Sequence, residues 1–151
     1  MQKFSDNQVA LISGGTSGIG FATAELLLKQ GWCVVINGRN EWDGQEAVVK
    51  LRRISSKVRF VQGDVSKVMN CRRIVEDTIR LFGNLNALVT AAGYYEERLL
   101  EDVDEQNFDE MFGTNVKGTV FLCQAAAPYL KQVHGSIVTI SSDAGLQGNV
   151  A

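Results

Sequence analysis

Apolar and polar positions along the chain fall into two alternating patterns. Short continuous apolar runs predict strands that are buried on both faces, as in a parallel sheet. Longer segments whose apolar residues recur at helical spacing lie between these runs. The expected strands are Val9 to Ser13, Cys33 to Ile36, Val58 to Val61, Leu85 to Val89 and Ser136 to Ile140.

The segments between the strands predict helices with recognisable ends. Ser and Asp are good N-caps, and Gly commonly ends a helix. We expect helices over Phe21 to Leu28, Glu41 to Arg53, Cys71 to Phe82 and Phe108 to Cys123, with caps at Ser66 and Asp104, ends at Gly31 and Gly83, and a kink at Pro128. Strands alternating with helices predict an α/β fold, an open doubly wound parallel sheet of about five strands with helices on both faces.

Length and composition fit one folded domain over residues 1–151. The chain is 45% apolar and 21% charged, which excludes a disordered chain. Its formal net charge of −2 argues against a nucleic-acid partner. The polar start, Met1 to Asn7, lacks the apolar core of a signal peptide, and no apolar run approaches the roughly 18 residues of a membrane span.

The cysteines and the histidine form no recognisable catalytic or metal-binding motif. Three widely spaced cysteines, Cys33, Cys71 and Cys123, form no zinc motif or disulfide framework, so we expect buried thiols, no metal and a cytoplasmic location. The one histidine, His134, stands beside Gly135 in an expected turn and is interpreted as an ordinary loop residue.

A glycine-rich segment, Ser13-Gly-Gly-Thr-Ser-Gly-Ile-Gly20, joins the first strand to the first helix. Glycine allows a sharp turn and lets a phosphate approach the backbone, and the helix that follows presents free N–H groups to that phosphate. The segment is not a P-loop, because Phe21-Ala22 stands where Lys-Ser/Thr would be needed. Position 23 is Thr, so the strict G-x-G-x-x-G pattern is absent too. A turn that only permits tight strand–helix packing is the alternative.

Five motifs in order resemble the short-chain dehydrogenase/reductase family. They are Gly14-x3-Gly18-Ile19-Gly20, Asp64-Val65 after the third strand, Ala91-Ala92-Gly93 after the fourth, Asn115, and Ser142 after the fifth. The resemblance covers essentially the whole chain and implies a Rossmann-type domain. The cofactor-binding residues that it implies, together with the loop residues between the glycines and Arg39, are Gly14, Thr16, Ser17, Gly18, Ile19, Gly20, Arg39, Asp64, Val65, Ala91, Ala92 and Gly93.

Two departures from the family pattern are visible. Thr90-Ala91 precedes Ala92-Gly93 and carries neither asparagine of the usual Asn-Asn-Ala-Gly form. The family's Tyr-x3-Lys would follow Ser142 by about a dozen residues, just beyond Ala151, so we expect the domain to be incomplete at its carboxyl-terminal side. Tyr94, Tyr95 and Tyr129 are each followed four residues later by a residue other than Lys.

The resemblance implies catalytic roles for Ser142 and Asn115. Ser142 would hydrogen-bond the substrate oxygen, and Asn115 would hold a backbone carbonyl and a proton-relaying water. Asn115 shares an apolar helix face with Phe108 and Leu122, so we expect a buried amide with partners. The alternatives are a serine in an ordinary turn and an asparagine that only bridges helix and strand.

The end of the second strand, Asn37-Gly38-Arg39, favours NADP(H) over NAD(H). An acidic residue there would bind the ribose hydroxyls, whereas Arg can pair with a 2′-phosphate. Glu41 is the acidic counter-candidate, and a solvated Arg39 is the alternative. Asp64 would accept from the adenine amino group or, alternatively, cap the next helix.

Three functions follow as hypotheses. The first is an oxidoreductase that transfers hydride between NADP(H) and a small-molecule carbonyl/alcohol pair. We expect this chain to be inactive alone, because it lacks the catalytic Tyr and Lys of the family. The second is a non-catalytic dinucleotide-binding module. The third is a truncation product that self-associates as a homo-oligomer, because the fifth strand would be an open edge.

Overall fold

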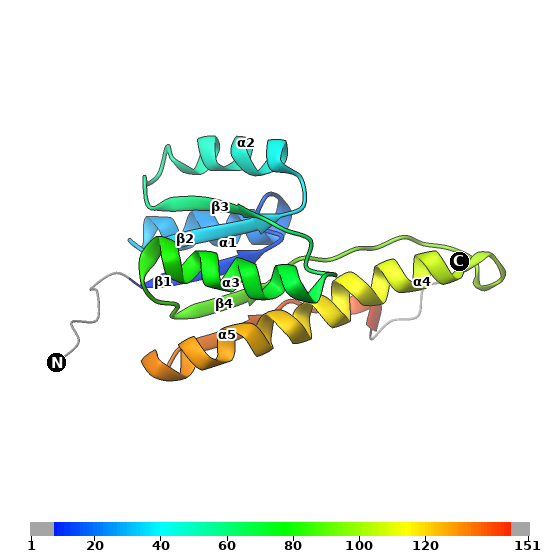
Figure 1. Cartoon of the computed structure of the whole chain (residues 1–151). Helices are drawn as coiled ribbons and strands as arrows, with labels where there is room; N and C mark the ends of the chain where they lie inside the picture. The colour runs from blue at the N-terminus through cyan, green and yellow to red at the C-terminus, as the bar shows by residue number, and fades with distance from the viewer. Residues whose placement is uncertain (1–7, 146–151) are drawn as a thin grey trace.

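A five-stranded parallel sheet forms the centre of the molecule (Figure 1). The computed structural model describes residues 8–145. The strands are β1 (Val9–Ser13), β2 (Cys33–Gly38), β3 (Val58–Gln62), β4 (Ala87–Thr90) and β5 (Ser136–Thr139). Their order is β3-β2-β1-β4-β5, and every neighbouring pair is parallel. The doubly wound sheet expected from the sequence is confirmed.

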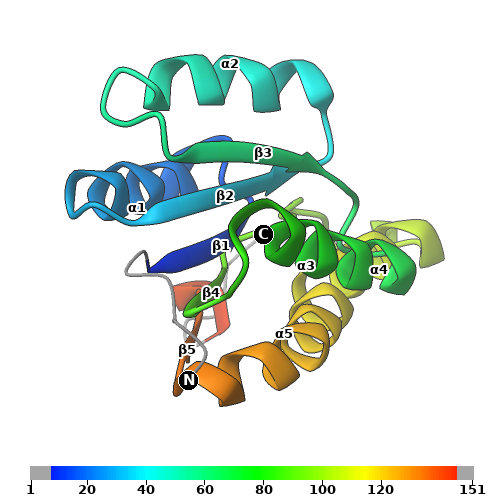
Figure 2. The same ribbon diagram turned by 60° about the vertical axis from the view of Figure 1, so that its left-hand side comes forward.

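Helices cover both faces of the sheet, as Figure 2 shows from the side. The helices α1 (Gly18–Lys29) and α2 (Glu41–Leu51) pack on one face. The helices α3 (Val68–Phe82) and α5 (Thr119–Val133) pack on the other. The shorter α4 (Glu105–Phe112) continues through a π-helical segment, η2 (Gly113–Gly118), into α5. Single 3-10 turns lie at η1 (Leu100–Asp102) and η3 (Asp143–Gly145).

Alternating strand side chains build the two halves of the core. Ile12 and Ile36 point toward α1 and α2, whereas Leu11, Val35 and Leu88 point toward α3 and α5. All five of these side chains are fully buried. Burial on both faces explains why the strands appear in the sequence as continuous apolar runs.

Helix ends agree with the sequence in two places and differ in one. Gly83 ends α3 with a φ of 85°, and Asp104 caps α4 by accepting from the Asn107 N–H at 2.7 Å. The expected cap at Ser66 is wrong, because α3 begins at Val68 after Lys67, which makes no side-chain capping bond. Pro128 lies inside α5, which continues to Val133.

The apolar face predicted for the long helix is partly wrong. Leu122 is buried as expected, but Phe108, Phe112 and Val116 are 51%, 49% and 50% exposed. The reason is that α4 extends past the end of the sheet (Figure 1), where no strand lies beneath it. The π-helical segment also breaks the 3.6-residue periodicity on which the expected face was based.

β5 is the edge strand on one side of the sheet, and all four of its residues are exposed. The three cysteines are free. Among residues 8–145, no helix combines the length and apolar character that crossing a bilayer requires. The polar start, Met1 to Asn7, lies outside the described residues.

Candidate functional site

The glycine loop turns sharply between β1 and α1. Gly14 has a φ of +64°, and a Cβ there would lie 2.7 Å from the backbone of Ala92. Gly20 is equally constrained, because a Cβ would collide with the carbonyl oxygen of Gly14. Gly18 has a φ of +52°, and apart from its chain neighbours and the backbone of its own helix no described atom lies within 4 Å of where its Cβ would be. The loop is therefore closed toward the protein and open at Gly18.

The first turn of α1 faces a cavity of about 340 Å³. The hydroxyl of Ser17 forms no capping bond to this turn, and the turn holds no acidic residue. Every expected cofactor-binding residue except Asp64 lines the cavity. Three segments distant in sequence, the glycine loop, the end of β2 and Ala91–Gly93, therefore meet at one place.

The carboxyl ends of β2 and β3 form the next wall. A Cβ on Gly38 would lie 2.7 Å from Cγ2 of Thr16, so a carboxylate at position 38 would not fit without a shift. Arg39 is exposed and forms no ion pair with another described residue. Glu41 lies in the first turn of α2, where its carboxylate accepts from Nε2 of Gln45 at 2.8 Å.

Asp64 is the one expected cofactor-binding residue that does not line the 340 Å³ cavity. It lines a larger neighbouring cavity of about 1010 Å³, which Arg39 also borders. Its Oδ1 accepts from the backbone N–H of Ser66 at 2.9 Å, so the carboxylate forms a local turn before α3. Val65 is 4% exposed, and its carbonyl oxygen accepts from the Cys71 thiol at 3.1 Å. Burial is the main cause that raises the pKa of that thiol to about 11.

Ser13 and Asn115 hold the segment that follows β4. The buried Ser13 accepts from the Ala92 N–H at 3.2 Å. Asn115, in the π-helical segment, accepts from the Tyr94 N–H and donates to the Tyr94 carbonyl, both at 2.8 Å. Its amide thus has partners as expected, but the expectation that it is buried is wrong, since Asn115 is exposed.

Ser142 and Asn115 line the same cavity of about 530 Å³, together with Ala91, Ala92 and Gly93. Ser142 follows β5 and is exposed; its Oγ accepts from the Ala144 N–H at 3.2 Å. Since Ala91–Gly93 also border the 340 Å³ cavity, the two cavities are neighbours across this segment. The structure therefore brings together both residues expected at the catalytic end.

A polar network shapes the loop between β4 and α4. Glu96 accepts from the Tyr94 hydroxyl at 2.5 Å, from Nε of Arg98 at 3.0 Å and from Nδ2 of Asn107 at 2.8 Å. These bonds, the Tyr94 bond first, lower the pKa of Glu96, and the same bond raises the pKa of Tyr94. Arg98 also pairs with Asp104 at 2.8 Å.

The family model described as short chain dehydrogenase matches residues 8–151, nearly the whole sequence. The chain belongs to the short chain dehydrogenase family. Its relatives include an uncharacterized oxidoreductase of Methylorubrum extorquens, 38% identical over 138 residues, an alignment that covers 91% of this chain and 55% of that protein. Another is 11-beta-hydroxysteroid dehydrogenase A of Sesamum indicum, 38% identical over 137 residues, covering 89% of this chain and 39% of that protein.

Solved structures agree with this short chain dehydrogenase fold. An NADH-dependent reductase, A1-R′, responsible for alginate metabolism, superposes with a TM-score of 0.86 at 27% identity, over 97% of this chain and 64% of that one. The Cj0485 dehydrogenase gives a TM-score of 0.85 at 28% identity, over 95% and 54%. The chain therefore spans about half the length of the short chain dehydrogenases that it matches.

Four further residues line the 340 Å³ cavity of this short chain dehydrogenase: Asn37, Gly38, Gly63 and Thr114. From the sequence, Asn37 and Gly38 are interpreted only as neighbours of Arg39, and Gly63 and Thr114 are not predicted at the site. A polar residue ending an otherwise apolar strand is the signal that marks Asn37, whereas nothing in the local pattern marks Thr114. Among the described residues, no group of three His, Cys, Asp or Glu side chains is arranged to hold a metal ion.

Proposed function

We propose that this chain binds a nicotinamide dinucleotide and is the cofactor-binding domain, over residues 1–151, of an oxidoreductase acting on a small-molecule carbonyl/alcohol pair. The observation that carries the proposal is the 340 Å³ cavity at the glycine loop, lined by segments from three strand ends. Relative to the family we propose that this domain is incomplete.

The residues at the cavity fit a dinucleotide. Gly14 and Gly20 leave no room for side chains on the protein side, and Gly18 leaves open space on the other. The N–H groups at the start of α1 lack a side-chain cap from Ser17. Free N–H groups at a helix start favour an anion such as a pyrophosphate. Gly14, Thr16, Ser17, Gly18, Ile19 and Gly20 would hold it there.

We infer a preference for NADP(H) over NAD(H). Position 38 is glycine, so it offers no carboxylate to bind ribose hydroxyls, and a Cβ there would lie 2.7 Å from Cγ2 of Thr16. The exposed guanidinium of Arg39 borders the cavity and suits a 2′-phosphate. Asp64 and Val65 would flank the adenine, and Ala91, Ala92 and Gly93 the middle of the dinucleotide.

At the catalytic end, Ser142 and Asn115 would act from the 530 Å³ cavity. When bound, the cofactor supplies or accepts the hydride. Ser142 would hydrogen-bond the substrate oxygen, and Asn115 would hold the Tyr94 backbone that borders the cavity. Within residues 1–151 no tyrosine precedes Lys by four residues, so we expect little turnover by these residues alone.

Calorimetric titration with NADPH and, separately, NADH tests the proposal. We expect NADPH to bind more tightly, and Arg39→Ala to reduce NADPH affinity by roughly tenfold or more, since a hydrogen bond to a charged group contributes about 1.5–3 kcal/mol and about 1.4 kcal/mol is tenfold. NADH affinity should change little. Arg53→Ala, in the turn that follows α2, is the matched control. Failure of both nucleotides to bind at millimolar concentration would refute the proposal.

A second candidate is self-association of a non-catalytic chain, favoured by the edge strand β5. Ile137, Val138 and Ile140 are 41%, 50% and 40% exposed. An exposed apolar edge strand is a template for pairing with another copy. We propose a homo-oligomer in which β5 pairs with β5 of a second chain.

A further inference from the structure

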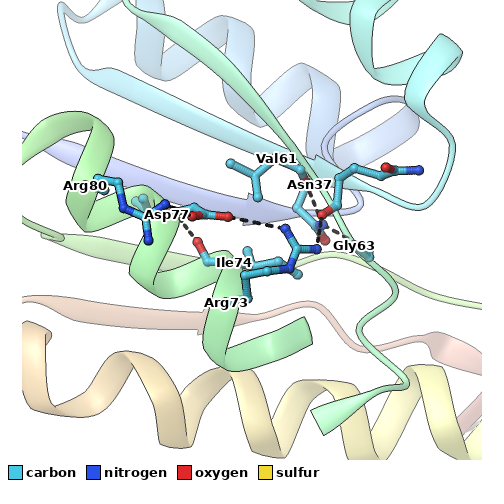
Figure 3. A network of polar contacts seen from close by, with 9 residues as sticks. Asn37, Val61, Gly63, Arg73, Ile74, Asp77 and Arg80 are labelled. Atoms are coloured by element: carbon cyan, nitrogen blue, oxygen red, sulfur yellow. Dashed lines mark hydrogen bonds and ion pairs between the residues drawn. The ribbon is translucent and has the colours of Figure 1, made fainter. Parts of the chain in front are cut away.

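Three consecutive backbone carbonyls at the end of β3 are held by side chains from two other elements (Figure 3). Nδ2 of Asn37, on β2, donates to the carbonyl oxygens of Val61 and Gly63, each at 3.0 Å. Nη2 of Arg73, on α3, donates to the carbonyl oxygen of Gln62 at 2.7 Å. Both side chains therefore act on the chain immediately before Asp64.

Asn37 also connects this segment to the glycine loop. Asn37 is 1% exposed, and its backbone carbonyl oxygen accepts from the Gly15 N–H at 3.0 Å. Both hydrogens of its amide are used by the two carbonyls. A buried amide with its donors satisfied has one favoured orientation. One residue thus links the phosphate side of the cavity with the end of β3.

Arg73 is itself held in place. Its Nη1 lies 3.3 Å from Oδ2 of Asp77, and the same carboxylate pairs with Arg80 at 2.7 Å, as Figure 3 shows. Gly63 packs directly on α3, since a Cβ there would lie 2.8 Å from Cδ1 of Ile74. The end of β3 is therefore pressed against α3 and cannot shift without breaking these contacts.

We infer that Asn37 and Arg73 are positioning residues for the nucleotide: by holding the carbonyls of Val61, Gln62 and Gly63, they place the Asp64–Val65 segment at the cofactor cavity. Gly63 and Val65 line that cavity. The inference rests on the proposed function. A site whose backbone is ordered before binding loses less conformational freedom when the ligand arrives, so the affinity is higher.

The experiment compares nucleotide affinity with stability in the full chain. Calorimetric titration uses NADPH and 2′,5′-ADP, which contains only the adenosine half. Arg73→Ala is the main variant, because Arg73 is half-exposed and its loss leaves the core intact. Arg73→Lys retains one donor, and Asn37→Ser is a second, independent variant. Arg80→Ala is the matched control, since Arg80 shares Asp77 but, among the described residues, forms no hydrogen bond to β3. Circular dichroism establishes that each variant is folded at the titration temperature.

We expect Arg73→Ala and Asn37→Ser to weaken both ligands by the same factor, about tenfold, equal to about 1.4 kcal/mol. Arg73→Lys should recover part of the loss, and Arg80→Ala should bind like the unaltered chain. A purely structural role would lower the melting temperature and leave the dissociation constant of the folded protein unchanged, which would overturn the inference. If the unaltered chain binds neither ligand, the proposed function fails, and the inference with it.

Discussion

Short polar side chains form hydrogen bonds to individual backbone groups of the segment that follows β4. Ser13 fixes the Ala92 N–H, and Asn115 pairs with both the N–H and the carbonyl of Tyr94, as a neighbouring strand would. Because Ala91–Gly93 separate the two cavities, these bonds set the position of the wall between them. These bonds form although Thr90-Ala91 stands where the family motif has its asparagines.

Gly14→Ala tests whether position 14 requires glycine because of the close approach of the Ala92 backbone as well as because of its positive φ. Gly14 and Gly31 both have positive φ, +64° and +88°, but only at Gly14 would a Cβ meet backbone atoms, at 2.7 Å. Gly31→Ala should cost about 1–2 kcal/mol of unfolding free energy, the usual penalty of the left-handed conformation. Gly14→Ala should cost clearly more in urea denaturation. Equal losses would show that the loop moves away from Ala92 without penalty.

At the scale of elements, α4, η2 and α5 form one long helix with a π-helical middle. The π-helical segment carries Asn115 and lies against Val65, since a Cβ on Gly118 would lie 2.9 Å from the Val65 side chain. The start of this helix is fixed by Asp104, which caps α4 and pairs with Arg98. The helix therefore ties the loop after β4 to the segment after β3.

Acid should loosen the loop that precedes α4. The pKa of Glu96 is lowered, first by the Tyr94 hydroxyl, and the pKa of Asp104 is lowered, first by the Asn107 N–H. Groups with lowered pKa stabilise the fold above their unfolded values, which are about 4, and lose that contribution as the pH falls through the folded pKa. The free energy of unfolding, measured in urea from neutral to acid pH, should therefore decrease as the pH falls below these unfolded pKa values and through the folded ones.

Substitutions at two neighbouring glutamates test this prediction. Glu96→Gln removes the carboxylate at the centre of the network and should reduce the acid-dependent decrease. Glu97→Gln alters an exposed neighbour and should leave it unchanged. Identical pH profiles for both variants would contradict the assignment to Glu96.

On the scale of the whole molecule, the sheet is unevenly covered. Helices bury β1 and β2 on both faces, whereas β5 is exposed along its length. A substitution to Lys at Val138 places a charge on this edge, which opposes strand pairing. We expect the chain to sediment as a dimer or larger species, and Val138→Lys to sediment as a monomer.

Val49→Lys, on α2, is the control, because Val49 is 60% exposed but remote from β5. It should sediment like the unaltered chain. A monomeric unaltered chain would exclude self-association. If Val120→Lys, on α5, makes the chain monomeric and Val138→Lys does not, the contact between copies lies on α5 and not on β5.

The sequence alone determined the strands, most helix ends, the family and the segments that meet at the cavity. These follow from local signals: apolar runs, caps at Asp104 and Gly83, and glycines whose backbone conformation no other residue adopts easily. Parallel strands then bring their carboxyl ends to one edge.

Only the tertiary structure decided which side chains hold that edge together. Asn37 and Arg73 bond to carbonyls 24 and 11 residues away, and Asn115 bonds to a loop 21 residues away. Periodicity also places Asn115 and Phe112 on a buried face, yet both are exposed because the helix extends past the sheet. Burial and non-local hydrogen bonds depend on what lies opposite a residue in space, which no local pattern encodes.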